Sequence, residues 1–340
     1  MTTLKDIARA CGVSAVTVSD ILNSKSGAAS AETRERVLKA AKEMHYRPNL
    51  VARGLRNGRM NTVGVLLRYS HAPASGNPAA MILLDSVVAV NTKHRKTTIL
   101  VTMEDWPNEL GLSQNPALTA CDGVVLAVPP DIDALKPILD YHKLPFVSIG
   151  TKSSHPDVSY VDIDNIAAAK LAVQYLISKG HRRIAFLADV DESFQFAHDR
   201  LEGYRQALRE AGIPANPNDV LFGVDCFAAM PSHFSKTISD RPTALFCATD
   251  FAALAALAVL VNTCGMSVPD DISLMGFDDI PSLPTMRPAL TTVKQPLIEI
   301  GTTATELLLE IVEGRERAGK KILLPAMVVE RETVGPPFTG

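Results

Sequence analysis

The chain of 340 residues is poor in cysteine and has no long apolar run. Its longest apolar run, residues 251–261, is too short to span a bilayer and suits a buried helix. The polar, amphipathic N-terminus does not read as a signal peptide, so we expect a soluble cytoplasmic protein with no membrane partner. Scattered thiols, odd in number and without a CxxC pair, argue against disulfides and a zinc site and favour buried free thiols in a reducing compartment. The cysteines are Cys11, Cys121, Cys226, Cys247 and Cys264.

Sequence motifs of the common enzyme classes are also missing. The chain has no G-x-S-x-G, no HExxH, no phosphate-binding P-loop and no GxGxxG. The histidines that follow the first 60 residues have no spacing that makes a case for a metal site or a catalytic triad. We therefore expect a protein that is not an enzyme and holds neither a metal nor a cofactor. These histidines are His71, His94, His142, His155, His181, His198 and His233.

Charge is divided unevenly along the chain, although the total is only −3. Residues 1–60 hold eleven Lys and Arg against five Asp and Glu, a net of +6, and the remainder holds 23 against 32, a net of −9. A basic head on an acidic body suggests that the head meets a polyanion and the body does not. A run of like charges is often only a solvated surface. Charge alone therefore leaves two interpretations of the head, a nucleic-acid-binding surface or a solvated one.

The basic head reads as a bundle of short helices. Residues 4–11 have helical spacing and end at Gly12, Ser14 caps a second helix, and Ser30 caps a third that runs to about residue 45. A helix, a turn and a second short helix at this spacing are typical of the helix-turn-helix motif, whose second helix lies in the DNA major groove. The side chains at the start of that helix would then face base edges. They are Ala15, Val16, Thr17 and Asp20.

The segment that follows the head, "YRPNLVARGLRNGR" (46–59), contains a helix too weak to fold alone because it includes Gly54. We expect such a helix to form only when it is bound to DNA. Arg53 and Arg56 suit the minor groove, and Leu55 is a candidate wedge between base steps. The alternative reading is a flexible linker in which the leucine is incidental.

From residue 61 onward, short apolar strands alternate with segments of helical length. The pattern predicts strands at 61–67, 96–102, 122–128 and 144–150, and it then repeats with strands at 181–189, 219–224, 243–250 and 272–279. Alternation of this kind predicts parallel α/β sheets, and the repeat predicts two similar lobes. Ligands of such sheets bind beyond the carboxyl ends of the strands.

Several motifs in the right order resemble one family over nearly the whole chain. They are "TLKDIARACGVSAVTVSDILN", "SKGHRRIAFL", "RLEGYRQALREAGI", "CATDFAALAAL", "VPDDISLMGFDDI" and "LTTVKQPLIEIG". The chain resembles the lactose/galactose repressor family of bacterial transcription regulators. That resemblance implies a DNA-binding head, a hinge helix ordered by operator DNA, a body like periplasmic sugar-binding proteins, and a homodimer.

The resemblance also distributes the DNA contacts. Base reading falls to Ala15, Val16 and Asp20, whereas Thr17 fits a backbone or packing contact. Asp20 either accepts a hydrogen bond from cytosine, or positions a basic neighbour such as Lys25, or faces solvent near the DNA. The remaining contacts divide into a backbone set and a minor-groove set at the hinge. These are Ser14, Ser19, Asn23 and Arg53 for the backbone, and Val51, Ala52, Leu55 and Arg56 for the minor groove.

A small-molecule effector is implied between the two lobes. By resemblance Arg200 grips it and Asp278 binds it from the far side of the cleft. Guanidinium, carboxylate and amide or hydroxyl groups together suit a sugar-like polyol. Gly150 stands where many members have Asp, and segments 68–78 and 105–120 are irregular. The full candidate set is Arg200, Asp278, Thr249, Asp164, Gln295, Tyr69 and Phe227.

The domain boundaries follow from these motifs. We expect a DNA-binding domain at 1–47, a hinge at 48–60 and an effector-binding, dimerising body at 61–340. The N-lobe is expected at about 61–160 with a return segment at 281–293, and the C-lobe at about 161–280 with 294–331. The sequence therefore predicts a sequence-specific transcriptional regulator, which we expect to be a repressor. The alternative is a solute-binding protein without a transcriptional role, and a protein-interaction module would leave the basic head unexplained.

Overall fold

The computed structural model describes residues 2–338 apart from 23–26, 28, 47–58, 69–77, 104–114, 130, 191–192, 224 and 235–240. The chain divides into two compact units, residues 1–60 and residues 61–340. Residues 48–58 of the predicted hinge at 48–60 and most of the two irregular segments lie outside the described residues.

The first unit contains three helices in its described part, α1 (Leu4–Cys11), α2 (Ala15–Leu22) and α3 (Ala31–Glu43). A capping box between Thr3 and Asp6 opens α1, and Gly12 ends it with a left-handed φ of 64°. Ser30 caps α3 by accepting from the amide of Thr33. One small apolar core joins the three helices, so none of them has to be stable alone. That core is Ile7, Ala8, Cys11, Val18, Ile21, Val37 and Ala41.

The N-lobe is built on a parallel sheet of six strands in the order β11-β5-β4-β3-β1-β2. Its strands are β1 (Thr62–Arg68), β2 (Thr97–Met103), β3 (Gly123–Ala127), β4 (Phe146–Ile149), β5 (Ser159–Ile163) and β11 (Lys321–Leu324). Helices α5 (Pro78–Lys93), α7 (Pro116–Thr119) and α8 (Ile132–Tyr141) connect them. Helix α13 (Leu297–Val312) packs on α5 and on strands β3, β4 and β5.

The C-lobe has a second sheet of six strands in the order β12-β10-β9-β8-β6-β7, parallel except for the antiparallel pair β10 and β12. Its strands are β6 (Ile184–Ala188), β7 (Val220–Phe222), β8 (Ala244–Cys247), β9 (Ser273–Asp278), β10 (Thr291–Lys294) and β12 (Met327–Val329). Its helices are α9 (Asn165–Ser178), α10 (Gln195–Glu210), α11 (Cys226–Phe234) and α12 (Asp250–Asn262). Two 3₁₀ turns, η2 (Pro217–Asp219) and η4 (Leu283–Thr285), complete it.

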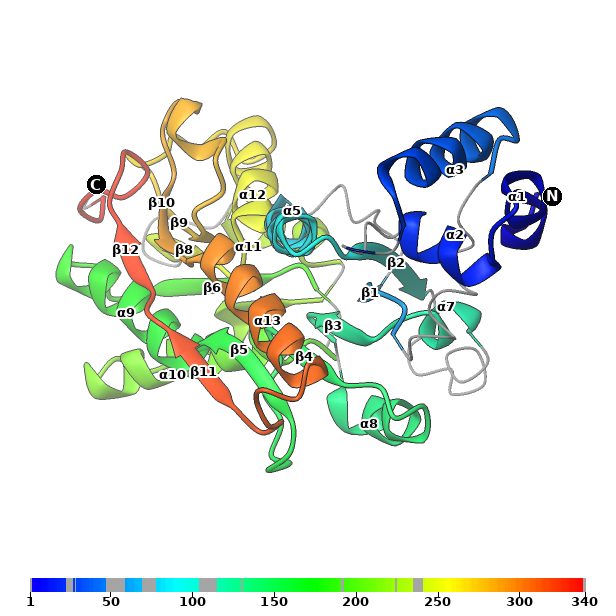
Figure 1. The fold of residues 1–340 in the computed structure, drawn as a ribbon. Coiled ribbons are helices and arrows are strands. Elements are labelled where there is room, and N and C mark those ends of the chain that lie inside the picture. The colour runs from blue at the N-terminus through cyan, green and yellow to red at the C-terminus, as the bar shows by residue number, and fades with distance from the viewer. Residues whose placement is uncertain are drawn as a thin grey trace. The chain divides into compact units, whose positions relative to one another are not determined.

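Three crossings connect the lobes. The chain passes from β5 to α9, returns from β10 to α13, and passes again from β11 to β12. Figure 1 shows α13 lying with the N-lobe strands and the β11–β12 ribbon continuing from one lobe into the other. The predicted fold class, a helical head with a two-lobed α/β body, is confirmed.

The predicted return segments were assigned to the wrong lobes. Residues 281–293 were expected in the N-lobe, but β10 pairs with β9 in the C-lobe sheet. Residues 294–331 were expected in the C-lobe, but α13 packs on the N-lobe and β11 pairs with β5. Only the last part of that segment, β12, lies in the C-lobe sheet as expected. The first crossing also falls after Ile163, since β5 belongs to the N-lobe sheet. Strand order depends on pairing between distant segments, which the local apolar pattern does not encode.

Candidate functional site

Helix α2 carries the predicted base-reading residues, with Ala15, Val16 and Thr17 in its first turn and Asp20 in its second. Ser14 accepts a hydrogen bond from the amide of Thr17 at 3.0 Å, and the two hydroxyls lie 2.9 Å apart. Val18 and Ile21 are buried against the other two helices. Val16 lies on the opposite side and is 66% exposed, an unusual position for an apolar side chain. An exposed Val at the start of this helix is what contact with a thymine methyl group requires.

The other predicted DNA contacts divide into three groups. Ala15, Thr17 and Asp20 are partly exposed on α2. Ser19 is only 4% exposed, which fits packing within the head better than a phosphate contact. The rest lie outside the described residues: Asn23, Val51, Ala52, Arg53, Leu55 and Arg56, with Lys25.

Arg200 is the centre of a buried polar cluster beside the first crossing between the lobes. It lies on α10 and is 4% exposed. Its Nε donates to Asn165 Oδ1 at 3.0 Å, and its Nη1 donates to the carbonyl of Ala248. The guanidinium carbon lies 3.6 Å from the ring centre of Phe277 and 4.8 Å from that of Phe196. Aromatic faces on this scale stabilise a cation that burial has separated from water.

Asp278 closes the same cluster from the end of β9. Its Oδ1 lies 3.7 Å from Arg200 Nη1 and accepts from Gln295 Nε2 at 2.6 Å. The amide of Gln295 also donates to the carbonyl of Asp278 at 3.2 Å. Since Gln295 follows β10, this pair connects the cluster to the second crossing. The structure therefore brings together three predicted residues, Arg200, Asp278 and Gln295.

Two cluster residues were not predicted from the sequence, Asp162 and Asn165. Asn165 Nδ2 donates to Asp162 Oδ2 at 3.1 Å, so Asn165 joins the carboxyl group of Asp162 to Arg200. Both are nearly fully buried, at 3% and 1% exposure. The available signal was the string "DIDN" at the end of an apolar run, in which only Asp164 was singled out.

Burial dominates the electrostatics of this cluster. It raises the pKa of Asp278 to about 7, against the positive charge of Arg200, and the pKa of Asp162 to about 6. Burial also lowers the pKa of Arg200 to about 10, while Asp278 and Asp162 oppose that shift, so the guanidinium stays charged at neutral pH. The site thus combines a fixed cation with carboxyl groups that titrate near neutrality.

The other predicted effector residues take different roles. Thr249 caps α12 by accepting from the amide of Ala252 at 3.0 Å. Asp164 is exposed and caps α9 by accepting from the amide of Ala167 at 3.1 Å. Phe227 is half-buried and packs with the C-lobe core around α11 and α12. Tyr69 lies outside the described residues.

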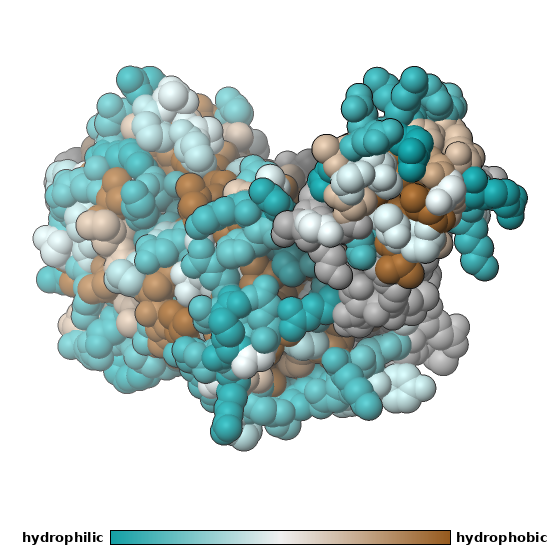
Figure 2. Space-filling model, in the orientation of Figure 1, coloured by the Kyte–Doolittle hydropathy of each residue, from teal (hydrophilic) through white to brown (hydrophobic). Residues whose placement is uncertain are grey.

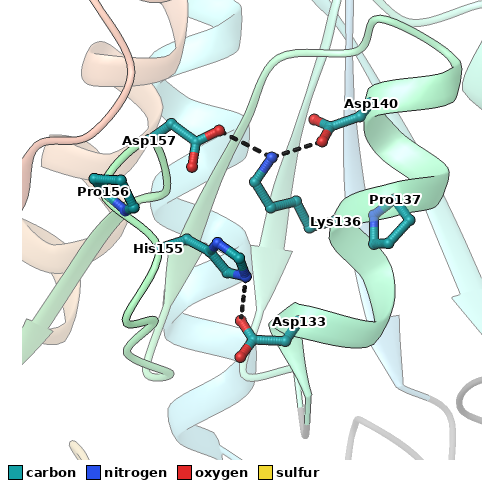
Figure 3. A pocket seen from close by; sticks show the side chains of 7 residues that line it. All are labelled: Asp133, Lys136, Pro137, Asp140, His155, Pro156 and Asp157. Atoms are coloured by element: carbon teal, nitrogen blue, oxygen red, sulfur yellow. Dashed lines mark hydrogen bonds and ion pairs between the residues drawn. The ribbon is translucent and has the colours of Figure 1, made fainter.

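A surface hollow of about 540 Å³ lies elsewhere, in the N-lobe. Figure 3 shows Lys136 between two carboxylates, Asp140 at 2.6 Å and Asp157 at 2.9 Å, with His155 directed at Asp133. The charged side chains of this hollow are paired with one another and partly exposed, and none of the predicted site residues lies there. Among the described residues no group of three or more His, Cys, Asp or Glu could hold a metal, and no helix has the length and apolarity needed to cross a membrane.

A helix-turn-helix unit and a two-lobed α/β body with a polar cluster at its crossings together define the architecture of a DNA-binding regulator. Comparison with known proteins agrees. Residues 3–49 match the family of bacterial regulatory proteins named for lacI, and residues 173–334 match a periplasmic binding protein-like domain. The HTH-type transcriptional repressor PurR of Vibrio campbellii is 34% identical over 98% of this chain and 99% of its own. PurR of Erwinia tasmaniensis is 31% identical over 98% and 97%.

Solved structures give the same result. A complex of the transcriptional regulator CelR with cellobiose matches with a TM-score of 0.72 and 30% identity, over 98% of this chain and all of that one. The lac repressor dimer bound to operator and the anti-inducer ONPF matches with a TM-score of 0.83 and 26% identity, over 98% and 99%. The chain belongs to the lacI family of bacterial regulatory proteins. The predicted family and regulator class are confirmed.

Proposed function

We propose that the protein is a cytoplasmic repressor whose affinity for operator DNA is set by a small effector bound between the lobes. The observation that carries the proposal is the buried cluster of Arg200, Asp278 and Gln295. It contacts two of the three crossings, where a ligand can act on the angle between the lobes. Among the relatives named above, PurR and the lac repressor are repressors, which supports this role over that of a solute carrier or an enzyme.

We infer that the effector is sugar-like and carries several hydroxyl groups. A guanidinium and carboxyl groups of shifted pKa donate and accept hydrogen bonds together, as a polyol requires. CelR was solved with cellobiose, and a regulator from Enterococcus faecium, 26% identical over 81% of this chain, was solved with ribose. Asp164, Thr249, Phe227 and Tyr69 remain part of the proposal as secondary contacts.

In the head, we propose that Val16 and Ala15 contact base edges and that Asp20 selects one base of each half-site. Ser14, Thr17, Ser19, Asn23 and Arg53 serve the backbone and the fit of the helix. For the hinge, 48–60, the proposal rests on the sequence alone. Val51, Ala52, Leu55 and Arg56 enter the minor groove, with Leu55 as the wedge.

We propose that the operator-binding species is a homodimer. Helix α12 is apolar on all sides, and Phe251 and Val261 on its outer face are 44% and 47% exposed. Figure 2 shows hydrophobic patches among hydrophilic residues on the visible surface. A second copy is the occupant we assign to this face, because the lac repressor structure named above is a dimer.

One pair of experiments tests the repressor proposal. Selection of operators from a random DNA library should return one near-palindromic site, and a thermal-shift screen of sugars, sugar phosphates and nucleobases should give one stabilising class. Arg200→Ala should abolish that shift, since it removes the buried donor, while Lys136→Met should leave it unchanged. No operator, or a ligand shift retained in Arg200→Ala, contradicts the proposal.

A further inference from the structure

A direct contact between the lobes lies beside the cluster, in addition to the three crossings. Lys152 belongs to the loop that follows β4 in the N-lobe. Its backbone amide donates to Gln195 Oε1 at 2.7 Å, and its Nζ lies 3.3 Å from Asp199 Oδ2. Gln195 and Asp199 stand one turn apart on α10 in the C-lobe, where residues four apart share a face.

The loop that carries Lys152 is fixed to the N-lobe on both sides. Thr151 is 3% exposed and its hydroxyl donates to the carbonyl of Pro129 at 2.6 Å. The hydroxyl of Ser153 donates to Asp133 Oδ1 at 3.2 Å, and Lys321 Nζ donates to the carbonyl of Ser153 at 3.3 Å. Lys152 therefore stands on a rigid part of one lobe and reaches across to the other.

The receiving side is equally fixed, because α10 packs closely on α9 within the C-lobe. Asp199 also precedes Arg200, so the contact lies next to the proposed effector site. The side chains of Lys152 and Asp199 are only 24% and 20% exposed. Partial burial reduces screening by water, so this pair is stronger than an ordinary surface ion pair.

We propose that Lys152 is an interlobe bridge that holds the two lobes in the arrangement in which these contacts form, which we call closed. A hydrogen bond and an ion pair from one residue connect two rigid elements, so opening the lobes has to break both. The effector then acts on a body that is already biased toward closure, and the bridge sets part of its affinity. That consequence rests on the proposed function, whereas the bridge itself needs neither ligand nor DNA.

Amide hydrogen exchange of the full-length, ligand-free protein tests the bridge, because the Lys152 amide is protected only while the lobes are closed. Lys152→Met and Asp199→Asn should each speed exchange of this amide by about fivefold, and Gln195→Ala by more, since it removes the acceptor. Lys152→Arg should retain protection. Lys136→Met is the matched control, since its ion pairs with Asp140 and Asp157 stay within the N-lobe.

Circular dichroism should show that every variant is folded. If Lys152→Met does not fold, Asp199→Asn still removes the ion pair and decides the test. Unchanged protection in both Lys152→Met and Asp199→Asn overturns the bridge. Operator titration separates the two proposals. Lys152→Met and Asp199→Asn should shift operator affinity in the same direction, with Lys136→Met at the wild-type value. If the wild type binds no operator, the proposed function fails, and the exchange result still decides the bridge.

Discussion

The carboxyl group of Asp162 shows how burial acts on a single residue of the cluster. It accepts hydrogen bonds from its neighbour's amide, Ile163 N at 2.7 Å, and from Asn165. Burial nevertheless raises its pKa from the ordinary value of 3.8 to about 6. Between these values the folded protein holds a proton that the unfolded chain has released, so stability falls as pH rises through this window.

Asp162→Asn should remove this pH dependence. The shift corresponds to about 2 to 3 kcal/mol of folding free energy, lost by the wild type between about pH 4 and pH 6 and constant above. Urea unfolding at pH 4.5 and pH 7.5 should therefore show the wild type losing stability relative to Asp162→Asn at the higher pH. Asp164→Asn, at an exposed cap, is the control. A constant difference between wild type and Asp162→Asn would refute the shift.

Sequence reasoning identified the residues of the cluster whose motifs are distinctive. Arg200, Asp278 and Gln295 were predicted, and in the structure the carboxylate of Asp278 contacts both of the other two. Thr249 and Asp164 were predicted as ligand contacts but serve as helix caps, a role that the same residue types at a strand-to-helix junction also fit. Lys152 had no local signal, since its partners lie 43 and 47 residues further along the chain.

At the scale of elements, α9 and α10 pack so closely that Gly203 has no room for a side chain. A Cβ at this position would lie 2.3 Å from the carbonyl oxygen of Ile166 and 2.9 Å from Cβ of Ala169. The obstacle is backbone, which cannot move aside without separating the helices. This contact fixes α10, and with it Arg200 and Asp199, on the C-lobe.

Gly203→Ala should destabilise the body by about 3 kcal/mol, although alanine favours the helix by about 1 kcal/mol. Gly212→Ala is the matched control, because a Cβ there meets nothing within 4 Å. That control should cost only about 1 kcal/mol, from its left-handed φ of 68°. Denaturant midpoints measure both. Equal effects for the two substitutions would show that the α9–α10 contact is looser than described.

Element types were predictable because strands and helices carry different apolar periods. The eight predicted strands of the body correspond to β1–β4 and β6–β9, with ends shifted by a few residues. The strands that were missed, β5, β10, β11 and β12, have three to five residues each, and β11 alternates exposed and half-buried positions. Without a long apolar run they gave no strong signal, and their places in the sheets depend on distant partners.

For the whole molecule, the division of charge matters more than the total. Eleven Lys and Arg against five Asp and Glu make residues 1–60 basic, while the remaining 280 residues are acidic. An acidic body repels DNA, so non-specific binding through the body is disfavoured. Attraction to phosphate is thereby restricted to the heads, and the number of heads that bind at once sets the salt dependence.

Salt titration of operator binding should therefore report the dimer. Affinity for the selected full site should fall with a slope in log salt of about −0.9 per neutralised phosphate, and two heads should give about twice the slope of a half-site. Fluorescence anisotropy between about 50 and 300 mM salt, a range over which the Debye length falls by roughly half or more, measures both sites. Lys39→Gln, in the head, should reduce the slope by about one per head if it contacts phosphate, whereas Lys136→Met should not. Equal slopes on full and half sites would mean that one head binds at a time, and sedimentation would then show a monomer.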